Sequence, residues 1–196
     1  MPVRPIIFIA SSLNRCNNGR QAKFQATRDI EGCFWAVLLL RHMEVSIIFD
    51  SGFEQMADEA WLRGVAEAVL VAEGKYNAEI GIVITGQDQI QGLNKRYRAK
   101  DTPTDVLAFA MADVKDETPF PAQKDGIDHL GEVIISVEQA AIQAGRHRHS
   151  VGREIAVLLV HGVLHLIGYD HNEQEEEKTM NDRARAILKH LPRRVS

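Results

Sequence analysis

Three histidines in the C-terminal third of the chain have the spacing of metal ligands. His161 and His165 are four residues apart, so a helix would present both imidazoles on one face, with Cβ atoms about 5–6 Å apart. Gly168 can adopt the left-handed conformation that ends a helix, which would let His171 return to the same place. Three imidazoles with an open fourth position are typical of a catalytic zinc site. We therefore predict that these histidines bind one divalent ion.

The predicted ion is Zn²⁺, although three imidazoles also suit Ni²⁺, Cu²⁺ or Co²⁺. The histidine pair lies in the segment Arg153–Ile167, which is nearly all apolar between its ends and is predicted to be a central buried helix. The alternative for a histidine on such a helix is a hydrogen-bonded core residue. An unsatisfied buried imidazole would cost about 1–3 kcal/mol, and a shared ion removes that cost for both rings.

The same spacing resembles the H-E-x-x-H-x-x-G-x-x-H motif of the metzincin peptidases. Those enzymes use the glutamate after the first histidine as a general base, and Gly162 occupies that position here. Peptide hydrolysis by that mechanism is therefore disfavoured. Met180 has the place of a metzincin Met-turn but is better explained as a helical core residue. A zinc-dependent hydrolase of a peptide or small molecule remains an alternative.

Four segments in order resemble another family. The run His161–His171 resembles the H-G-x-L-H-L-x-G-Y-D-H signature of the YbeY family, metal-dependent endoribonucleases involved in ribosomal RNA maturation. Leu93–Phe109 is similar to its adjoining segments L-N-x-x-Y-R and D-x-P-T-D-V-L-S-F, with Ala108 in place of the serine. Leu130–Ser136 is similar to its strand L-G-D-I-x-I-S, with Glu132 in place of the aspartate.

The resemblance runs from about Met43 to Leu191 and implies a function. It implies a single-strand-preferring endoribonuclease that acts in maturation of the 3′ end of 16S ribosomal RNA and in ribosome quality control. Its partners would be RNA and the small ribosomal subunit, in the cytoplasm. The metal ligands of the family fall on the three histidines already named. A non-catalytic, ribosome-associated metalloprotein is a further alternative.

The functional arginine of the family falls on Arg98. A guanidinium can hold two phosphate oxygens and stabilise the charge of the transition state, so Arg98 is the predicted catalytic and substrate-binding residue. Lys95 and Arg96 would guide the RNA backbone. Asp170 and Asp105 can orient a histidine or accept a proton, but the residues do not identify the general base, and the RNA 2′-hydroxyl can itself be the nucleophile.

The composition fits one soluble globular domain. The chain has 196 residues, 45% hydrophobic and 26% charged, with a formal net charge of −4. Cys16 and Cys33 form no CxxC pair, which favours a reducing compartment. No apolar run approaches the roughly 18 residues of a membrane span. Residues 1–42 carry bases but no acid before Asp29, so they are interpreted as an extension, a transit peptide or a segment before a start at Met43, and 43–196 as the endoribonuclease domain.

Hydrophobic periodicity predicts four strands and five helices in the order βαβαββααα. The predicted strands are Val45–Phe49, Glu79–Thr85, Val106–Met111 and Gly131–Ser136. The predicted helices are Glu54–Glu73, Asp88–Tyr97, Val137–Ala144, Arg153–Ile167 and Glu173–Leu191. Ser136 and Ser150 are expected to cap helices, Gly145 and Gly168 to end them, and Tyr97 to lie in the core. The order predicts an α+β fold in which helices pack mainly on one face of a four-stranded mixed sheet.

Overall fold

The computed structural model describes residues 42–111, 126–169 and 174–191. All of them belong to one compact unit, Leu40–Ser196. The predicted extension before residue 42 and the predicted roles of Asp170 and His171 lie outside the described residues. The proposed boundary between residues 42 and 43 therefore stays a prediction.

The predicted order of strands and helices is confirmed over the described residues. In chain order the elements are β1 (His42–Phe49), α2 (Glu59–Ala72), β2 (Asn77–Thr85), α3 (Gln87–Arg98), β3 (Val106–Ala110), β4 (Asp128–Ser136), α4 (Val137–His147), α5 (Val151–Ile167) and α6 (Gln174–His190). Most bounds differ from the predictions by one to three residues, which is ordinary for helix and strand ends.

The four strands form one mixed sheet in the order β1-β2-β4-β3. β1 pairs with β2 and β2 with β4 in parallel, whereas β3 runs antiparallel to β4. The register places Ile47, Ile82, Val133 and Ala108 in one row across the sheet. Because side chains alternate between the faces of a strand, this row points to one side, where it meets the main core. The predicted α+β class with a mixed sheet is confirmed.

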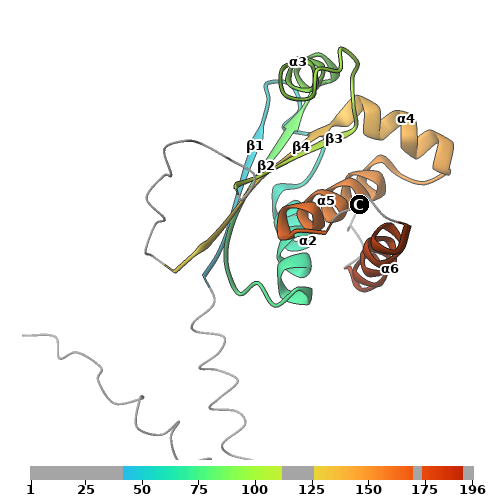
Figure 1. The fold of residues 1–196 in the computed structure, drawn as a ribbon. Coiled ribbons are helices and arrows are strands. Elements are labelled where there is room, and N and C mark those ends of the chain that lie inside the picture. The colour runs from blue at the N-terminus through green and yellow to red at the C-terminus, as the bar shows by residue number, and fades with distance from the viewer. Residues whose placement is uncertain (1–41, 112–125, 170–173, 192–196) are drawn as a thin grey trace, which may run out of the picture. The chain divides into compact units, whose positions relative to one another are not determined.

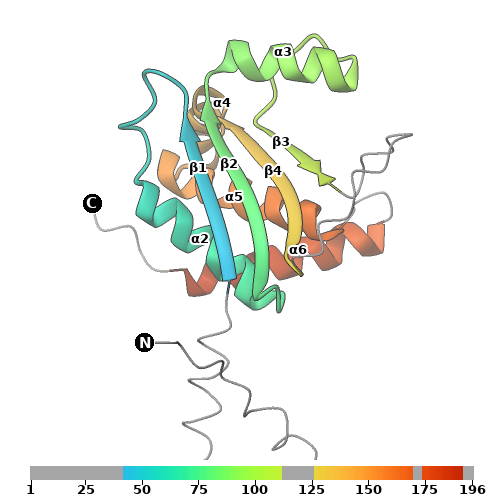
Figure 2. The same cartoon turned by 90° about the vertical axis from the view of Figure 1, so that its left-hand side faces the viewer.

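Helices α2, α5 and α6 lie on one side of the sheet, and α3 lies at one end (Figures 1 and 2). The main core is built between α2, α5 and the sheet. A smaller cluster, formed by Ile90, Leu107 and Ile134 with Val83, Leu93 and Phe109 around it, joins α3 to the other face of the sheet. The helices are therefore mainly on one face, as predicted.

Helix α5 is the central buried helix that the sequence predicted. It contacts α2, α4 and α6 as well as β3 and β4. It packs tightly on β4 at Gly162, where a Cβ atom would lie 2.5 Å from Cγ1 of Val133. No side chain fits there unless the helix, the strand or the side chain of Val133 moves. The glycine thus sets the distance between β4 and the helix that carries His161 and His165.

Serine caps and one glycine stop were predicted correctly. The side chains of Ser136 and Ser150 accept hydrogen bonds from the backbone N–H groups of Gln139 and Arg153 at the starts of α4 and α5. Gly168 ends α5 in the left-handed conformation, with φ 104° and ψ 12°. This turn is the one required to bring the chain back after the histidine pair.

Three local predictions were wrong. Helix α4 does not end at Gly145 but continues to His147, and Arg148 takes the left-handed position with φ 56° and ψ 44°. Helix α2 does not begin at Glu54, because Asp58 caps it and accepts a hydrogen bond from the N–H of Trp61 at 2.7 Å. Tyr97 is not a core residue: it is 57% exposed. Its ring meets Phe109 edge-on, with 5.1 Å between ring centroids.

Within the part of the chain that the structure describes, no single helix is long and apolar enough to cross a membrane. Helices α4 and α5 meet the length and composition criteria only as a pair, and that pair is bent by 110°.

Candidate active site

His161 and His165 lie one turn apart on the same face of α5, and their imidazoles converge. The two Nε2 atoms are 3.1 Å apart, and the ring planes meet at 82° with centroids 4.6 Å apart. Two imidazole nitrogens that bind one zinc ion at about 2.0–2.1 Å can be at most about 4 Å apart. The pair therefore fits two ligands of a single metal ion.

The turn after α5 orients one of these rings. Nδ1 of His165 lies 2.9 Å from the backbone oxygen of Tyr169, which the left-handed Gly168 brings back over the helix end. Because a carbonyl oxygen can only accept, the ring donates from Nδ1 and keeps its lone pair at Nε2. A carbonyl partner of this kind is typical of metal-binding histidines, whose other nitrogen faces the ion.

A cavity of about 630 Å³ joins the histidine pair to Arg98. It lies between the end of α3, strand β3 and helices α4 and α5, and its lining includes Arg98, His161 and His165. The structure thus brings together three of the predicted site residues from segments more than sixty positions apart. The position of His171 lies outside the described residues.

The loop after Arg98 is held by polar contacts from three residues of α3, Gln91, Asn94 and Lys95. Nδ2 of the buried Asn94 donates to the backbone oxygen of Thr102 at 2.8 Å. Nζ of Lys95 donates to Oδ2 of Asp101 at 2.6 Å, and this hydrogen bond, followed by one from Gln91, holds the pKa of the Asp101 carboxyl below its ordinary value. These contacts fix the chain on both sides of the Arg98 position.

The other two predicted RNA contacts lie beside the cavity rather than in its lining. Lys95 is engaged with Asp101, and the guanidinium of Arg96 lies over the ring of Tyr97, with its Cζ 5.3 Å from the centroid. Tyr97 itself lines the cavity. Lys95 and Arg96 thus lie in the last turn of α3, the same turn that carries Arg98.

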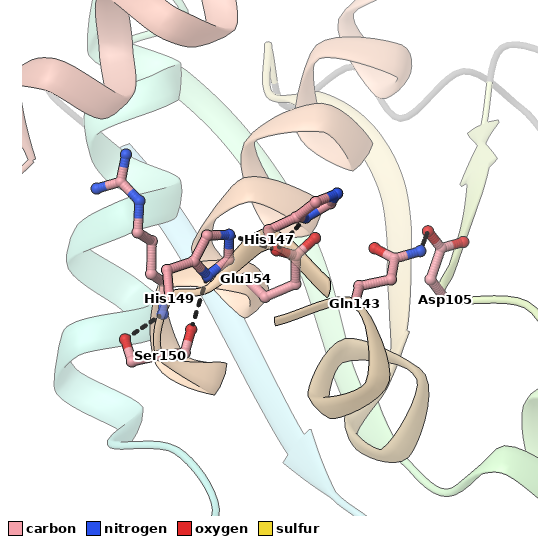
Figure 3. A network of polar contacts seen from close by, with 7 residues as sticks. Asp105, Gln143, His147, His149, Ser150 and Glu154 are labelled. Carbon is pink, nitrogen blue, oxygen red and sulfur yellow. Dashed lines mark hydrogen bonds and ion pairs between the residues drawn. The ribbon is translucent and has the colours of Figure 1, made fainter. Parts of the chain in front are cut away.

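Asp105, just before β3, also lines the cavity. Its Oδ2 accepts a hydrogen bond from Nε2 of Gln143 at 2.7 Å (Figure 3). Its Oδ1 accepts one from the backbone N–H of Val106 at 2.9 Å. The carboxylate therefore links the start of β3 to α4. Its predicted role as a proton acceptor or as an orienting partner stays a prediction.

Sequence reasoning missed two polar residues of this cavity, His147 and Glu154. Glu154 is only 2% exposed, although carboxylates are rarely buried unless they are paired. A signal was present: Glu154 precedes His161 by seven residues, two helical turns, so both lie on one face of α5. With His149, these two side chains form a group able to hold a metal ion.

Residues 48–192 match the model of the family described as endoribonuclease YbeY. The chain belongs to the YbeY endoribonuclease family. An endoribonuclease YbeY from Dehalococcoides mccartyi strain 195 is 46% identical over 164 residues, covering 81% of this chain and 95% of that protein. The YbeY endoribonuclease of Carboxydothermus hydrogenoformans is 44% identical over 137 residues, covering 68% and 88%. The resemblance seen in the four sequence segments is thus confirmed.

The fold is similar to a solved structure as well. The solution structure of TM1509 from Thermotoga maritima matches with a TM-score of 0.50 and 21% identity, covering 74% of this chain and 87% of that one. The YbeY match indicates a protein that acts on RNA.

Proposed function

We propose that this chain is a Zn²⁺-dependent endoribonuclease that cleaves single-stranded ribosomal RNA, with the ion held by His161, His165 and His171. Family membership supports the endoribonuclease activity. The observation that carries the site assignment is the cavity that Arg98 shares with the converging pair His161 and His165. By family resemblance, the substrate is the 3′ end of 16S ribosomal RNA on the small subunit, and the enzyme acts in ribosome quality control in the cytoplasm.

In this proposal the metal supplies Lewis acidity toward a phosphate oxygen or a water molecule. His165 is held in the metal-binding tautomer by its hydrogen bond to the carbonyl of Tyr169. Arg98 binds two oxygens of the scissile phosphate and stabilises the negative charge that develops on them in the transition state. Lys95 and Arg96, on the same helix end, attract the adjoining RNA backbone.

Two nucleophiles are compatible with these residues, and their products differ. Attack by the 2′-hydroxyl of the RNA leaves a cyclic phosphate, whereas attack by water leaves a 3′-hydroxyl or a 3′-phosphate without a cyclic intermediate. Mass spectrometry of the cleaved ends separates the two routes. Asp105, held by Gln143, is the proposed proton acceptor in the cavity.

The packing at Gly162 argues against the peptidase alternative. A zinc peptidase of the metzincin type needs a glutamate at this position, but a Cβ there would lie 2.5 Å from Cγ1 of Val133. The side of α5 that would carry the base faces strand β4 instead of the cavity. Phosphodiester chemistry with Arg98 as the second charged group remains the better account.

The test compares RNA and protein substrates. Metal-loaded full-length chain is incubated with single-stranded ribosomal RNA fragments and with casein. Arg98→Ala should slow RNA cleavage by about 10²–10³-fold through loss of transition-state stabilisation, and His165→Ala should abolish cleavage together with binding of the ion held by His161, His165 and His171. Arg185→Ala is the matched control, because this arginine lies on α6 with its side chain 77% exposed, and its rate should be unchanged.

RNA cleavage that persists equally in Arg98→Ala and His165→Ala would contradict the assignment and would indicate a contaminating nuclease. Casein hydrolysis that depends on His165 would favour the peptidase alternative. Ribosome binding by the wild-type chain without any cleavage of RNA would favour the non-catalytic, ribosome-associated alternative. Elemental analysis of the purified chain distinguishes Zn²⁺ from Ni²⁺ and other divalent ions.

A further inference from the structure

Two histidines and a buried glutamate converge where α4 turns into α5 (Figure 3). One oxygen of Glu154, Oε2, lies 3.2 Å from Nδ1 of His147 and 2.8 Å from Nε2 of His149. The three ligand atoms all lie within 4.8 Å of one another. Two imidazole nitrogens and one carboxylate oxygen thus point to a common centre.

The backbone is shaped to produce this convergence. His147 is the last residue of α4, and Arg148 adopts the left-handed conformation, with φ 56°, that non-glycine residues rarely take. The reversal turns His149 back toward the first turn of α5, where Ser150 caps the helix and Glu154 points inward. Both histidines therefore meet Glu154 because of one unusual backbone position.

The hydrogen bond at one nitrogen of His149 leaves the other nitrogen facing a carboxylate oxygen, a contact that is repulsive unless a positive charge lies between the two atoms. Its Nδ1 lies 3.1 Å from the backbone oxygen of Ser150, which can only accept, so Nδ1 carries a proton. A neutral ring then presents the lone pair of Nε2 to a carboxylate oxygen 2.8 Å away. Either a second ring proton or a metal ion between the two atoms removes this repulsion.

We propose that His147, His149 and Glu154 form a second divalent-cation site, separate from the site of His161 and His165. Two histidines and a glutamate are a known ligand set for Zn²⁺ with an open position, and imidazoles also suit Co²⁺ and Ni²⁺. Glu154 and His161 are seven residues apart, which corresponds to about 10 Å along the helix. The two ions would therefore not share a bridging ligand as in the common two-metal sites, where ions are about 3.5–4 Å apart.

The site faces the same cavity as the first one. Glu154 and His147 both line the cavity that holds Arg98 and His161. The side chain of Glu154 is 2% exposed, whereas that of His147 is 58% exposed. A cation at this site would therefore have one buried ligand and one ligand that is accessible to solvent. If the proposed function holds, this cation gives the cavity a second positive centre for a neighbouring phosphate of the same RNA strand. The metal site itself does not depend on that function.

Metal stoichiometry tests the proposal without any activity measurement. The full-length chain is stripped with a chelator, dialysed against Zn²⁺ or Co²⁺ and analysed for bound metal per chain. We expect the wild type to bind one ion more than either Glu154→Gln or His147→Ala. His165→Ala should instead lose the ion bound by His161 and His165. The double variant, which combines Glu154→Gln with His165→Ala, should therefore bind neither ion. With Co²⁺, the difference spectrum between wild type and Glu154→Gln should contain d–d absorption bands.

The matched control is His129→Ala. His129 also pairs with a carboxylate, its Nδ1 lying 2.6 Å from Oε2 of Glu79, but the pair is not part of a three-ligand group among the described residues. Its metal content should equal that of the wild type. Equal metal content in wild type, Glu154→Gln and His147→Ala would overturn the proposal and show that the cluster is a proton-mediated ion pair.

Two further results keep the interpretation clear. If Glu154→Gln fails to fold by circular dichroism, His147→Ala decides, because that side chain is mostly exposed and its removal leaves the core intact. A wild-type chain that binds both ions but does not cleave RNA would contradict the proposed function while leaving the second cation site supported.

Discussion

Substitution of Gly162 by alanine tests whether the packing of α5 on β4 sets the geometry of the site. The new Cβ would lie 2.5 Å from Cγ1 and 3.1 Å from Cγ2 of Val133, which is fully buried. Carbon atoms normally approach to about 3.5–4.0 Å, so the helix and strand must separate by about 1 Å or Val133 must leave its rotamer. Overpacking of this kind costs about 1–3 kcal/mol.

Helix propensity acts in the opposite direction and must be measured separately. Alanine is favoured over glycine inside a helix by about 1 kcal/mol. Gly64 in α2 supplies the control, because a Cβ there meets no atom within 4 Å. Gly64→Ala should therefore raise the free energy of unfolding by about 1 kcal/mol. The free energy of unfolding of Gly162→Ala should be about 1–3 kcal/mol lower than that of Gly64→Ala.

Urea unfolding of the full-length chain, followed by circular dichroism, measures these differences. Val133→Ala removes both clashing methyl groups, so the double variant Gly162→Ala with Val133→Ala should be more stable than the sum of the single changes predicts, by about 1–3 kcal/mol. Equal stabilisation by Gly162→Ala and Gly64→Ala would refute the packing argument. A shift of α5 should also weaken metal binding by His161 and His165, whereas Gly64→Ala should leave it unchanged.

Three further predictions concern the surroundings of the site. The Lys95 ammonium holds the pKa of Asp101 below its ordinary value of 3.8, so the stabilisation is present above that value and lost as the pH falls through the folded pKa. Lys95→Ala should return the pKa toward 3.8 in a carboxyl NMR titration. Ala99 ends α3 with φ 56°, and Ala99→Gly should therefore raise the free energy of unfolding by about 1 kcal/mol in thermal unfolding. Burial and then the carboxylate of Glu73 raise the pKa of Tyr169, so this stabilisation is present below the ordinary value of 10.0 and lost as the pH rises through the folded pKa. Glu73→Gln should lower that pKa in an alkaline absorbance titration, and an unchanged titration curve would contradict the assigned cause.

The sequence predicted most of what depends on local periodicity. The order of strands and helices, the buried α5 and the caps at Ser136 and Ser150 follow from short-range patterns, and all are confirmed. The convergence of His161 and His165 follows from helix geometry alone, since residues four apart share a face. The meeting of Arg98 with this pair does not, because it depends on how α3 and α5 are placed around β3.

The wrong predictions concern positions where tertiary packing or an unusual backbone conformation determines the structure. Gly145 is an ordinary stop signal, but α4 continues past it and Arg148 takes the left-handed position instead. That choice places His147 and His149 around Glu154, so the same residue explains both the wrong helix end and the missed cluster. The helical periodicity of α3 places Tyr97 among apolar residues and so predicts a core position. However, α3 packs only on a small apolar cluster on one face of the sheet, and the Tyr97 ring stays exposed.

Gly162 follows His161, where a metzincin peptidase has a glutamate, and this limits which residue can accept a proton. That side of α5 packs on Val133, so a base cannot come from the residue after the first ligand. Among the described residues that line the cavity, the carboxylates are Asp105 and Glu154. Glu154 is engaged by two histidines, and both oxygens of Asp105 accept hydrogen bonds, from Gln143 and from the Val106 N–H. In the proposed mechanism, the described residues offer two routes for proton transfer: Asp105 exchanges the amide of Gln143 for substrate, or the RNA 2′-hydroxyl loses its proton to solvent.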